Sequence, residues 1–289
     1  MKKVTTGVIA IAGFGTRFLP ATKAIPKEML PIIDRPIAQY IVEEMIQSGI
    51  KDIVFVTNST QKSILEQHFG RSPELERHLT IKGKTGQLKE IKQLSKLARF
   101  KYVIQPDMDK FYGTGACLRS VERLASHGPF ILAFGDDLVK SRVPFCRQLI
   151  TEYSRHKCPI IGAEEVPQSE THRYGIIETF SKTNRIKRII EKPKRRQTHS
   201  RLAILGRYLL TPAIFPVLRK LTTNHLGEIC LTDAFNIILK ESAIVVHKIQ
   251  GGQWYTTGDP TNYFRALLAY SVEQPALKKE LKRFTKESL

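Results

Sequence analysis

The chain has 289 residues, 42% hydrophobic and 25% charged, and this ordinary globular composition excludes disorder as its main state. No apolar run approaches the roughly 18 residues that a membrane-spanning helix needs, so we expect no membrane anchor. The 46 Lys and Arg outnumber the 27 Asp and Glu. The resulting net charge of +19 favours anionic partners, namely nucleic acid, acidic membranes or anionic small molecules.

The beginning of the chain predicts alternating strands and helices. Val4–Ala12 is a nearly continuous apolar run, typical of a strand that is covered on both faces. Four prolines between residues 18 and 36 exclude a regular helix there. Apolar residues recur at helical spacing in Ile37–Ser48, and Asp52–Thr57 reads as the next buried strand, followed by a helix in Gln61–Phe69. Such alternation predicts parallel βαβ units.

The remaining elements follow in the same manner until the pattern changes at Tyr174. Residues 71–100 are polar, basic and helix-prone, and then come strands at 101–105, 129–134 and 159–163 and helices at 114–125 and 145–156. After Tyr174 short strands and turns dominate, with strands at 175–180, 185–191, 203–210 and 243–249 and helices at 212–220, 231–240 and 261–271. We therefore predict one α/β domain over residues 1–289, with a mixed, mainly parallel sheet, helices on its faces and an inserted antiparallel part.

The cysteines and the N-terminus indicate the compartment. Four cysteines, at positions 117, 146, 158 and 230, form no closely spaced pair, which argues against a disulfide scaffold and for a reducing compartment. Met1-Lys2-Lys3 and the following apolar run mimic a secretory signal, but Gly15 and Arg17 interrupt it. We expect a cytoplasmic protein whose first apolar run is a buried strand.

Basic residues concentrate in two segments, 82–101 and 182–201. The second contains nine Lys and Arg residues and the single acid Glu191: Lys182, Arg185, Lys187, Arg188, Lys192, Lys194, Arg195, Arg196 and Arg201. Neither segment interleaves aromatic residues in the manner of a surface on which bases stack. We interpret them as solvated basic faces, so nucleic acid is an unlikely partner despite the charge.

The turn after the first predicted strand carries the strongest sign of a site. Gly13 and Gly15 allow the backbone to approach a ligand and offer free amides to phosphate. Arg17 can bind phosphate with two hydrogen bonds, and Lys27 adds a point charge. The segment is not a dinucleotide-binding fingerprint, because Phe18 occupies the third glycine position, and it is not a Walker loop.

A longer string strengthens this interpretation. Ala12–Pro31, continuing to Asp34-Arg35-Pro36, closely resembles the signature of the bacterial UTP–glucose-1-phosphate uridylyltransferases, a group of the sugar nucleotidyltransferases. The resemblance extends over residues 8–270. It implies the nucleotide-diphospho-sugar transferase fold, with a mainly nucleotide-binding half at 1–140, a mainly sugar-binding half at 141–260 and a C-terminal helical extension at 261–289.

The resemblance also implies roles for residues on the nucleotide side. Arg17 and Lys27 would be catalytic, holding the β- and γ-phosphates of UTP and stabilising the leaving group. The loop that binds the nucleotide would comprise Ala12, Gly13, Gly15 and Thr16. The uracil base would be read by Gln105, whose amide offers one donor and one acceptor, and by the loop that contains Gly113 and Gly115.

The resemblance further implies a metal ligand, a third catalytic cation and the sugar contacts. Asp136 follows a predicted strand and matches the aspartate that binds Mg²⁺. Lys192 would lie between the sugar phosphate and the α-phosphate. The residues expected to contact the sugar are Gly175, Glu178 and Glu191. The implied reaction converts UTP and glucose 1-phosphate to UDP-glucose and pyrophosphate. The family also implies a homo-oligomer, a dimer or a tetramer.

One departure from the family pattern keeps other functions open. The family has an aspartate at the end of its metal site where this chain has Thr256, and Asp137 or Asp259 would have to compensate. A catalytically weak or inactive regulatory paralogue that binds nucleotide sugar is therefore one alternative. An enzyme for another hexose 1-phosphate or for dTTP is another, since dTTP and UTP differ by one methyl group and an apolar pocket discriminates that by only about 1–3 kcal/mol.

Overall fold

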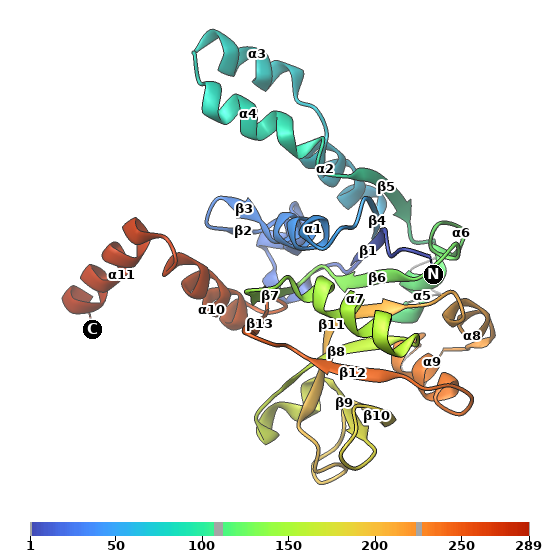
Figure 1. The fold of residues 1–289 in the computed structure, drawn as a ribbon. Coiled ribbons are helices and arrows are strands. Elements are labelled where there is room, and N and C mark those ends of the chain that lie inside the picture. The colour runs from blue at the N-terminus through green and yellow to red at the C-terminus, as the bar shows by residue number, and fades with distance from the viewer. Residues whose placement is uncertain (1, 107–111, 224–226, 289) are drawn as a thin grey trace.

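The computed structural model describes residues 2–106, 112–223 and 227–288 (Figure 1). Its central strand is β1 (Thr6–Ile11), which pairs in parallel with β4 (Asp52–Thr57) on one side and with β6 (Phe130–Phe134) on the other. β5 (Arg99–Ile104) extends this parallel part beyond β4. All three central strands are apolar because the sheet is covered on both faces.

The sheet changes direction beyond β6. β11 (Leu202–Leu210) pairs antiparallel with β6, with β8 (Ile160–Glu165) and with β9 (Gly175–Thr179). β10 (Ile186–Glu191) closes this edge of the sheet against β9, and β12 (Val245–Lys248) pairs in parallel with β8. The strand order β10-β9-β11-β6-β1-β4-β5 confirms the predicted mixed α/β sheet with an antiparallel part.

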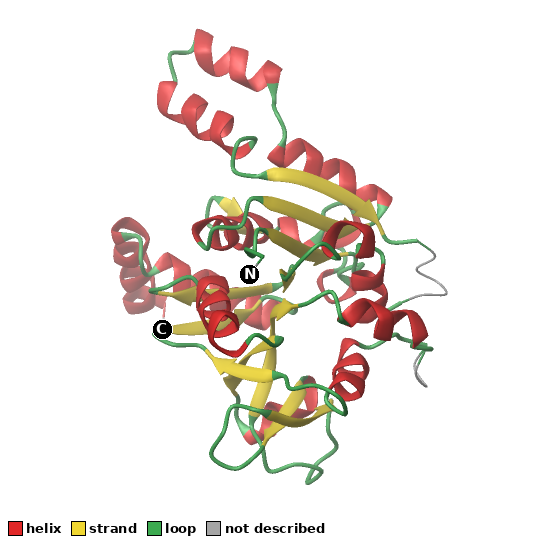
Figure 2. Cartoon of the chain, turned by 45° about the vertical axis from the view of Figure 1, so that its right-hand side comes forward, coloured by secondary structure: helices red, strands yellow, loops and turns green. Residues whose placement is uncertain are grey.

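Helices pack on both faces of the sheet (Figure 2). Alternate residues of β1 point to opposite faces, so Ile9 and Val8 belong to different core clusters. The cluster of Ile9 includes the apolar faces of α1 (Ile37–Gln47), α2 (Ser59–Phe69) and α7 (Phe145–His156). On the other face lie α5 (Thr114–Arg119), α8 (Ile214–Lys220) and α9 (Leu231–Ile238).

Two local features differ from the prediction. The single helix expected over residues 114–125 is two helices, α5 and α6 (Glu122–Ala125). Ser120 lies between them, and its hydroxyl donates to the carbonyl of Cys117, a local bond that competes with helical geometry. The proline-rich segment 18–36 contains no regular helix, as expected, but short elements fill it: η1 (Thr16–Phe18), η2 (Ala21–Lys23), η3 (Lys27–Met29), β2 (Pro31–Ile32) and β3 (Arg35–Pro36).

A two-stranded sheet that the sequence did not indicate lies beside the main one. β7 (Asp137–Ser141) pairs antiparallel with β13 (Gly252–Thr256). The two strands are more than 100 residues apart in sequence, and neither has the apolar run or the regular alternation that would reveal a strand. Their pairing brings Thr256 opposite Asp137.

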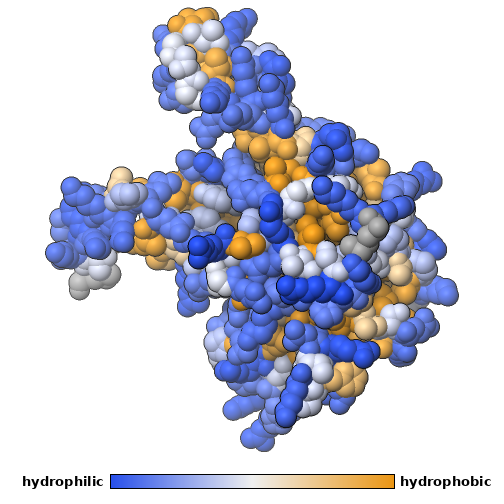
Figure 3. All heavy atoms as spheres, in the orientation of Figure 1, coloured by the Kyte–Doolittle hydropathy of each residue, from blue (hydrophilic) through white to orange (hydrophobic). Residues whose placement is uncertain are grey.

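Two helical pairs project from the body (Figure 1). The helix-prone segment 71–100 contains α3 (Pro73–Ile81) and α4 (Thr85–Leu94), and the C-terminus forms α10 (Pro260–Ser271) and α11 (Pro275–Ser288). Hydrophilic side chains dominate the surface of the C-terminal arm (Figure 3). Within the described residues, no helix combines the length and the apolarity that crossing a membrane would require.

Candidate active site

The predicted site residues from both halves of the chain meet at the carboxyl ends of β1 and β6. A cavity of about 250 Å³ lies there, with residues of the nucleotide side and of the sugar side in its wall: Arg17, Asp136, Gly175, Glu191, Lys192, Thr256 and Gly258. Ligands of open α/β sheets bind at this edge, where the carboxyl ends of parallel strands meet.

Asp136 and Lys27 form the charged centre of the site. Lys27 Nζ donates to Asp136 Oδ2, and the side chains are 16% and 25% exposed respectively. Burial alone would raise the pKa of Asp136, but the Lys27 ammonium outweighs it and lowers that pKa; burial would lower the pKa of Lys27, and Asp136 raises it. Both groups are therefore charged at neutral pH.

Glu28 adds a second, deeply buried carboxylate to this centre. Its Oε1 lies 3.5 Å from Lys27 Nζ, and its Oε2 has no hydrogen-bond partner among the described residues. Burial raises the pKa of Glu28 to about 7, even though the Lys27 charge opposes the shift. The side chain is 1% exposed and does not line the cavity, so we assign it no substrate contact.

Asp137 holds the turn that carries Asp136. Its Oδ1 accepts a hydrogen bond of 2.7 Å from Trp254 Nε1, and its Oδ2 accepts one of 3.1 Å from the amide of Gly206. Burial, together with the neighbouring charge of Asp136, raises the pKa of Asp137 to about 6. Each carboxylate oxygen thus accepts one hydrogen bond from the protein, and Asp137 also lines the cavity around Asp136.

Arg207 and Glu44 brace the same turn, and neither was predicted as a site residue. Arg207 is completely buried; its Nη2 donates to the carbonyl of Asp137 at 2.7 Å and to Glu44 Oε2 at 3.0 Å. Its Nη1 donates to the carbonyl of Phe134 at 3.3 Å. The one sequence signal was a carboxylate on the apolar face of a predicted helix, where Glu44 follows Ile41 by three residues.

The segment after β13 closes the site around Asp136. The amide and the hydroxyl of Thr257 both donate to the carbonyl of Asp136, at 2.6 and 2.8 Å. Arg17 Nη1 donates to the carbonyl of Gly258 at 3.2 Å. A Cβ atom on Gly258 would lie 3.2 Å from Asp136 Oδ2 and 3.6 Å from Thr256 Oγ1, which places the hydroxyl of Thr256 on the same side of the cavity as the Asp136 carboxylate.

The carboxylate of Asp259 is engaged by Asn262 and Arg173. Its side chain caps the N-terminus of α10 by accepting from the amide of Asn262 at 3.0 Å, and it forms an ion pair of 2.8 Å with Arg173. Asp259 does not line the cavity around Asp136, whereas Asp137 does. Among the described residues there is no group of three or more His, Cys, Asp or Glu side chains that could hold a metal ion.

The glycine loop after β1 has the open backbone that the sequence predicted. Gly15 has a φ of 64°, and the hydroxyl of Thr22 donates to its carbonyl at 2.8 Å. Gln61 Nε2 donates to the carbonyl of Gly13 at 2.8 Å. A Cβ atom on Gly13 would meet only the Lys27 side chain, at 4.0 Å, so this face of the loop is open. The loop begins at Ala12, directly after β1, and Thr16 begins η1.

Of the expected base-reading residues, Gln105 lines a second, smaller cavity, and Gly113 and Gly115 pack against Ile229 in its wall. Gln105 follows β5, is 5% exposed and lines a cavity of about 230 Å³ together with Ala116 and Ile229. Gly113 has a φ of 107°, and a Cβ atom there would lie 2.6 Å from the carbonyl oxygen of Ile229. The amide of Gly115 donates to that same oxygen at 2.8 Å. Both positions require glycine because the chain of Ile229 packs directly against them.

On the sugar side the structure brings together Gly175, Glu191 and Lys192. Gly175 and Glu191 are cross-strand partners in β9 and β10, and a Cβ atom on Gly175 would lie 3.1 Å from Glu191 Oε2. The amide of Lys192 donates to the carbonyl of Tyr174 at 3.1 Å. Its Nζ lies 4.0 Å from Glu191 Oε1, and its side chain is 57% exposed.

Glu178 does not join this group, contrary to the expectation from the motif. Its carboxylate receives hydrogen bonds from Arg188 at 2.7 Å and from the Thr198 hydroxyl at 2.8 Å, and it does not line the cavity. Arg188 is its cross-strand partner in β10. A position three residues after Gly175 lies on the opposite face of the strand, so the two cannot both face the sugar.

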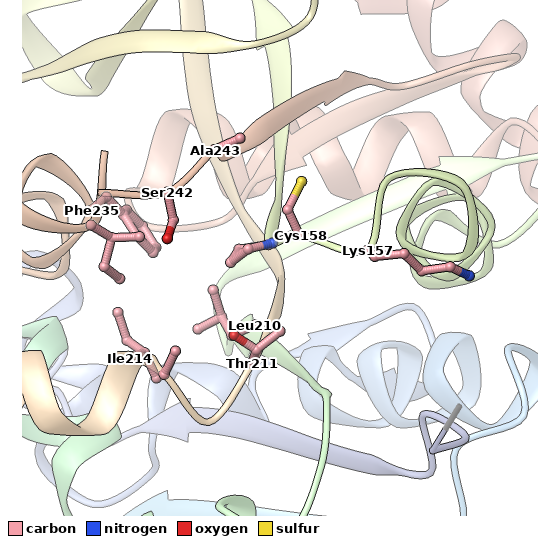
Figure 4. A pocket seen from close by; sticks show the side chains of 11 residues that line it. Lys157, Cys158, Leu210, Thr211, Ile214, Phe235, Ser242 and Ala243 are labelled. Carbon is pink, nitrogen blue, oxygen red and sulfur yellow. The ribbon is translucent and has the colours of Figure 1, made fainter. Parts of the chain in front are cut away.

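A further cavity of about 330 Å³ lies at the opposite end of the sheet (Figure 4). Leu210, Ile214 and Phe235 give it an apolar wall, and Cys158 faces it from the segment before β8. Leu210 pairs with Phe130, the first residue of β6. Asp136 lies at the other end of that strand, two residues after its last residue, Phe134. This cavity therefore belongs to neither substrate side.

Known proteins resemble the chain over nearly its whole length. Residues 6–273 match the nucleotidyl transferase family model. The chain is 41% identical to a UTP–glucose-1-phosphate uridylyltransferase of Bacillus subtilis (strain 168), covering 98% of this chain and 97% of that protein. It is 40% identical to the protein of that name from Staphylococcus haemolyticus (strain JCSC1435), covering 99% of each.

Solved structures of similar proteins share the fold of this chain over nearly its whole length. A crystal structure of a UDP-glucose pyrophosphorylase complexed with UDP-glucose superposes with a TM-score of 0.84 at 34% identity, covering 94% of this chain and 100% of that one. A UTP-bound UGPase from Acinetobacter baumannii superposes with a TM-score of 0.88 at 32% identity, covering 99% and 100%. The chain belongs to the nucleotidyl transferase family, as the string at its N-terminus predicted, and is a nucleotidyltransferase.

Proposed function

We propose that the chain transfers UMP from UTP to glucose 1-phosphate, forming UDP-glucose and pyrophosphate. The observation that carries this proposal is the cavity that Arg17, Asp136 and Lys192 line, with Lys27 paired to Asp136. Three cations around one carboxylate suit two polyanionic substrates that must approach each other. The names of the relatives and the ligands of the neighbouring structures point to the same pair of substrates.

The reaction needs positioning and charge neutralisation rather than a covalent intermediate with the protein. A phosphate oxygen of glucose 1-phosphate attacks the α-phosphorus of UTP in line. The bond from the α-phosphorus to the bridging oxygen breaks, and that oxygen leaves with pyrophosphate. In this proposal Arg17 and Lys27 hold the β- and γ-phosphates and stabilise the charge that develops on the leaving group. Lys192 holds the sugar phosphate beside the α-phosphate.

Mg²⁺ fits this site as an ion shared between the protein and the phosphates. Asp136 offers one partly exposed carboxylate at the cavity wall, and Mg²⁺ is commonly bound by one or two carboxylates together with substrate phosphates. When bound there, the ion would neutralise phosphate charge. The hydroxyl of Thr256 lies on the same side of the cavity and contributes no charge. For Asp136 to bind the ion, Lys27 would have to give up part of its contact with that carboxylate.

In this proposal one half of the chain binds the base and phosphates of the substrates, and the other half binds the sugar. Residues 1–140 provide the base and phosphate contacts through Gln105, the 113–115 loop and the loop from Ala12 to Thr16. Residues 141–260 provide the sugar contacts through Glu191 and Gly175, with Glu191 accepting hydrogen bonds from glucose hydroxyls. Glu178 is left out of this assignment because Arg188 and Thr198 hold its carboxylate.

Compartment and assembly are part of the same proposal. All four cysteines are free thiols, which suits a reducing cytoplasm.

The helical extension 261–289 would join copies of the chain into a dimer or a tetramer, because the side chains of Phe264 and Phe284 are 57% and 58% exposed. Single exposed side chains are common, so sedimentation of the full chain against Phe264→Ser/Phe284→Ser tests the assembly.

One observation favours a second candidate. Thr256 stands where the family pattern has a carboxylate, and Asp259, which Arg173 and Asn262 engage, does not line the cavity. Asp137 lines it and accepts hydrogen bonds from Trp254 and Gly206. A regulatory paralogue that binds nucleotide sugar without turning it over is consistent with that arrangement. Conversion of UTP and glucose 1-phosphate to UDP-glucose, followed by chromatography, separates the two. We expect product from the native chain and a loss of about 10²–10³-fold in Asp136→Asn.

The substrates are tested in the same assay. dTTP replaces UTP in one arm, and galactose 1-phosphate replaces glucose 1-phosphate in another. We expect UTP with glucose 1-phosphate to give the highest kcat/KM. Binding of UDP-glucose without product from any combination would instead support the regulatory paralogue.

A further inference from the structure

We propose that a basic cavity next to the substrate site binds a small phosphorylated metabolite through Arg195 and Arg196. The cavity has a volume of about 650 Å³ and lies between η4 (Gln168–Arg173) and the loop at 193–199. It shares no lining residue with the cavity around Asp136. The proposal does not depend on the reaction proposed above.

Two arginines and no acidic residue line this cavity. Arg195 and Arg196 are joined there by His172 and His199, and no Asp or Glu lines it. Within the described part of the chain, neither arginine forms an ion pair or a side-chain hydrogen bond. Two free guanidinium groups at the rim of one cavity suit phosphate, which guanidinium binds with paired hydrogen bonds.

The carboxylates close to this cavity are already engaged. Glu170 in η4 lies 3.6 Å from Arg173, and Glu178 binds Arg188 and Thr198. Neither is available to neutralise the arginines. An incoming anion therefore meets uncompensated positive charge rather than having to displace an existing ion pair, which lowers the cost of binding.

Local hydrogen bonds form the cavity in the absence of a ligand. Thr171 and Thr198 are 6% and 5% exposed and, with buried Pro193, make its floor. Gln168 Nε2 donates to the carbonyl of Thr198 at 3.5 Å and so joins the two walls. The hydroxyl of Thr198 in turn donates to Glu178. A preformed cavity of this size lies within the usual range of small-molecule sites, about 300–1,000 Å³.

The shape and lining favour a small ligand over nucleic acid. The basic segment 182–201, which the sequence suggested to be a solvated face, bends here into a concave wall, and hydrophilic side chains cover the lobe of β9 and β10 above it (Figure 3). No Phe, Tyr or Trp lines the cavity, so it offers no ring on which a base could stack. The volume exceeds that of one phosphate group and accommodates a phosphorylated sugar.

The walls of the cavity continue into the substrate site. η4 ends at Arg173, and the loop begins after Lys192; both of these residues line the cavity around Asp136. The amide of Lys192 donates to the carbonyl of Tyr174, which joins the two walls where they enter the substrate site. A ligand bound to Arg195 and Arg196 therefore lies against the same two segments that present Lys192 and Arg173.

Calorimetric titration of the full-length chain with fructose 1,6-bisphosphate, and separately with inorganic phosphate, tests the proposal. Arg195→Ala/Arg196→Ala removes the two cations of the cavity. Arg185→Ala/Lys187→Ala removes the same charge from exposed positions of the same segment outside it. Arg17→Ala weakens anion binding in the substrate cavity and so shows whether the probe binds there instead.

We expect saturable binding that Arg195→Ala/Arg196→Ala weakens at least about tenfold and that the other two variants leave within about twofold. Tighter binding of the bisphosphate than of phosphate identifies a phosphorylated metabolite as the ligand, and equal binding identifies free phosphate. Three results would overturn the proposal: no binding at millimolar concentration, equal weakening by both double variants, or weakening by Arg17→Ala alone. Single-stranded RNA that displaces the bisphosphate would assign the surface to nucleic acid.

Discussion

The phosphate end and the sugar end of the site are built in different ways. At the phosphate end, Lys27 and Asp136 are 16% and 25% exposed, and the turn that carries Asp136 is fixed by Arg207 and Trp254. At the sugar end, Lys192 is 57% exposed; its backbone amide donates to the carbonyl of Tyr174, and its Nζ lies 4.0 Å from Glu191 Oε1. One end is held by buried partners, whereas the other relies on a backbone turn and exposed side chains.

This difference has a chemical reason. Charge develops on the leaving pyrophosphate, so the groups that stabilise it act best when they are positioned before the reaction and shielded from water. The sugar must enter and the nucleotide sugar must leave, so an open sugar end does not hinder release. We therefore expect substitutions at the phosphate end to reduce both turnover and stability, and substitutions at the sugar end to reduce turnover alone.

The largest expected effect is at Lys27. In the proposed mechanism Lys27→Ala removes the cation that stabilises the leaving group, and it leaves Asp136 without its ion-pair partner, so kcat should fall about 10²–10³-fold. Lys23→Ala is the matched control, because Lys23 is exposed and forms no ion pair with any described residue; we expect its kcat to stay within about twofold. Steady-state pyrophosphate release measures both. Equal losses in the two variants would contradict the role of Lys27.

Arg207 tests whether buried partners hold the phosphate end. Arg207→Met leaves Glu44 buried and unpaired and should lower the free energy of unfolding by about 3–5 kcal/mol, measured by chemical denaturation. Arg207→Met/Glu44→Leu should recover most of that stability while kcat stays low, because the carbonyls of Phe134 and Asp137 lose their donor. Full activity in the double variant would show that the brace does not position Asp136.

Lys192 sharpens the comparison from the sugar end. In the proposed mechanism Lys192→Ala removes one charge-assisted contact to the sugar phosphate, so it should lower kcat/KM for glucose 1-phosphate by about 10–100-fold. The melting temperature should not change, because the side chain is mostly exposed. Lys194→Ala, two residues further along and outside both cavities, is the control. A loss of stability in Lys192→Ala would remove the distinction between the two ends.

The smallest effect concerns a buried titratable group that belongs to neither end. Burial lowers the pKa of His247, whose Nε2 lies 3.2 Å from Gln148 Oε1. A histidine with a folded-state pKa below its unfolded value stabilises the neutral fold, and this stability is lost as the pH falls through and below the ordinary pKa of 6.5. The melting temperature of the native chain should therefore drop more between pH 7.5 and pH 5.5 than that of His247→Gln. Parallel curves would contradict the assignment.

The sequence predicted what is encoded locally. The apolar run of β1, the glycine turn after it and the helical spacing of α1 each lie within a few residues, and the structure confirms all three. The family resemblance pointed to Asp136 and Gln105, and both follow strands at the edge where parallel strands end. Gln105 lines the second, smaller cavity.

What the sequence did not show depends on partners far apart in the chain. β7 and β13 pair across more than 100 residues, and Arg207 contacts Glu44 across 163. Hydrophobic periodicity cannot reveal such contacts. The motif gives Glu178 its place in a strand, but its register against Arg188 decides which face it takes, and the motif does not show that register. The basic segment 182–201 was interpreted as a solvated face; that its loop also lines a cavity depends on the position of η4.

Pyrophosphate release from UTP and glucose 1-phosphate with Mg²⁺, measured on the native chain and on Thr256→Asp, tests most directly whether one carboxylate at this site suffices. We expect robust release from the native chain, with Asp136 and the substrate phosphates holding the ion, and a change of less than about tenfold in Thr256→Asp. A silent native chain that Thr256→Asp restores to activity would contradict this, and would identify the protein as a regulatory paralogue with an intact fold and a disabled metal site.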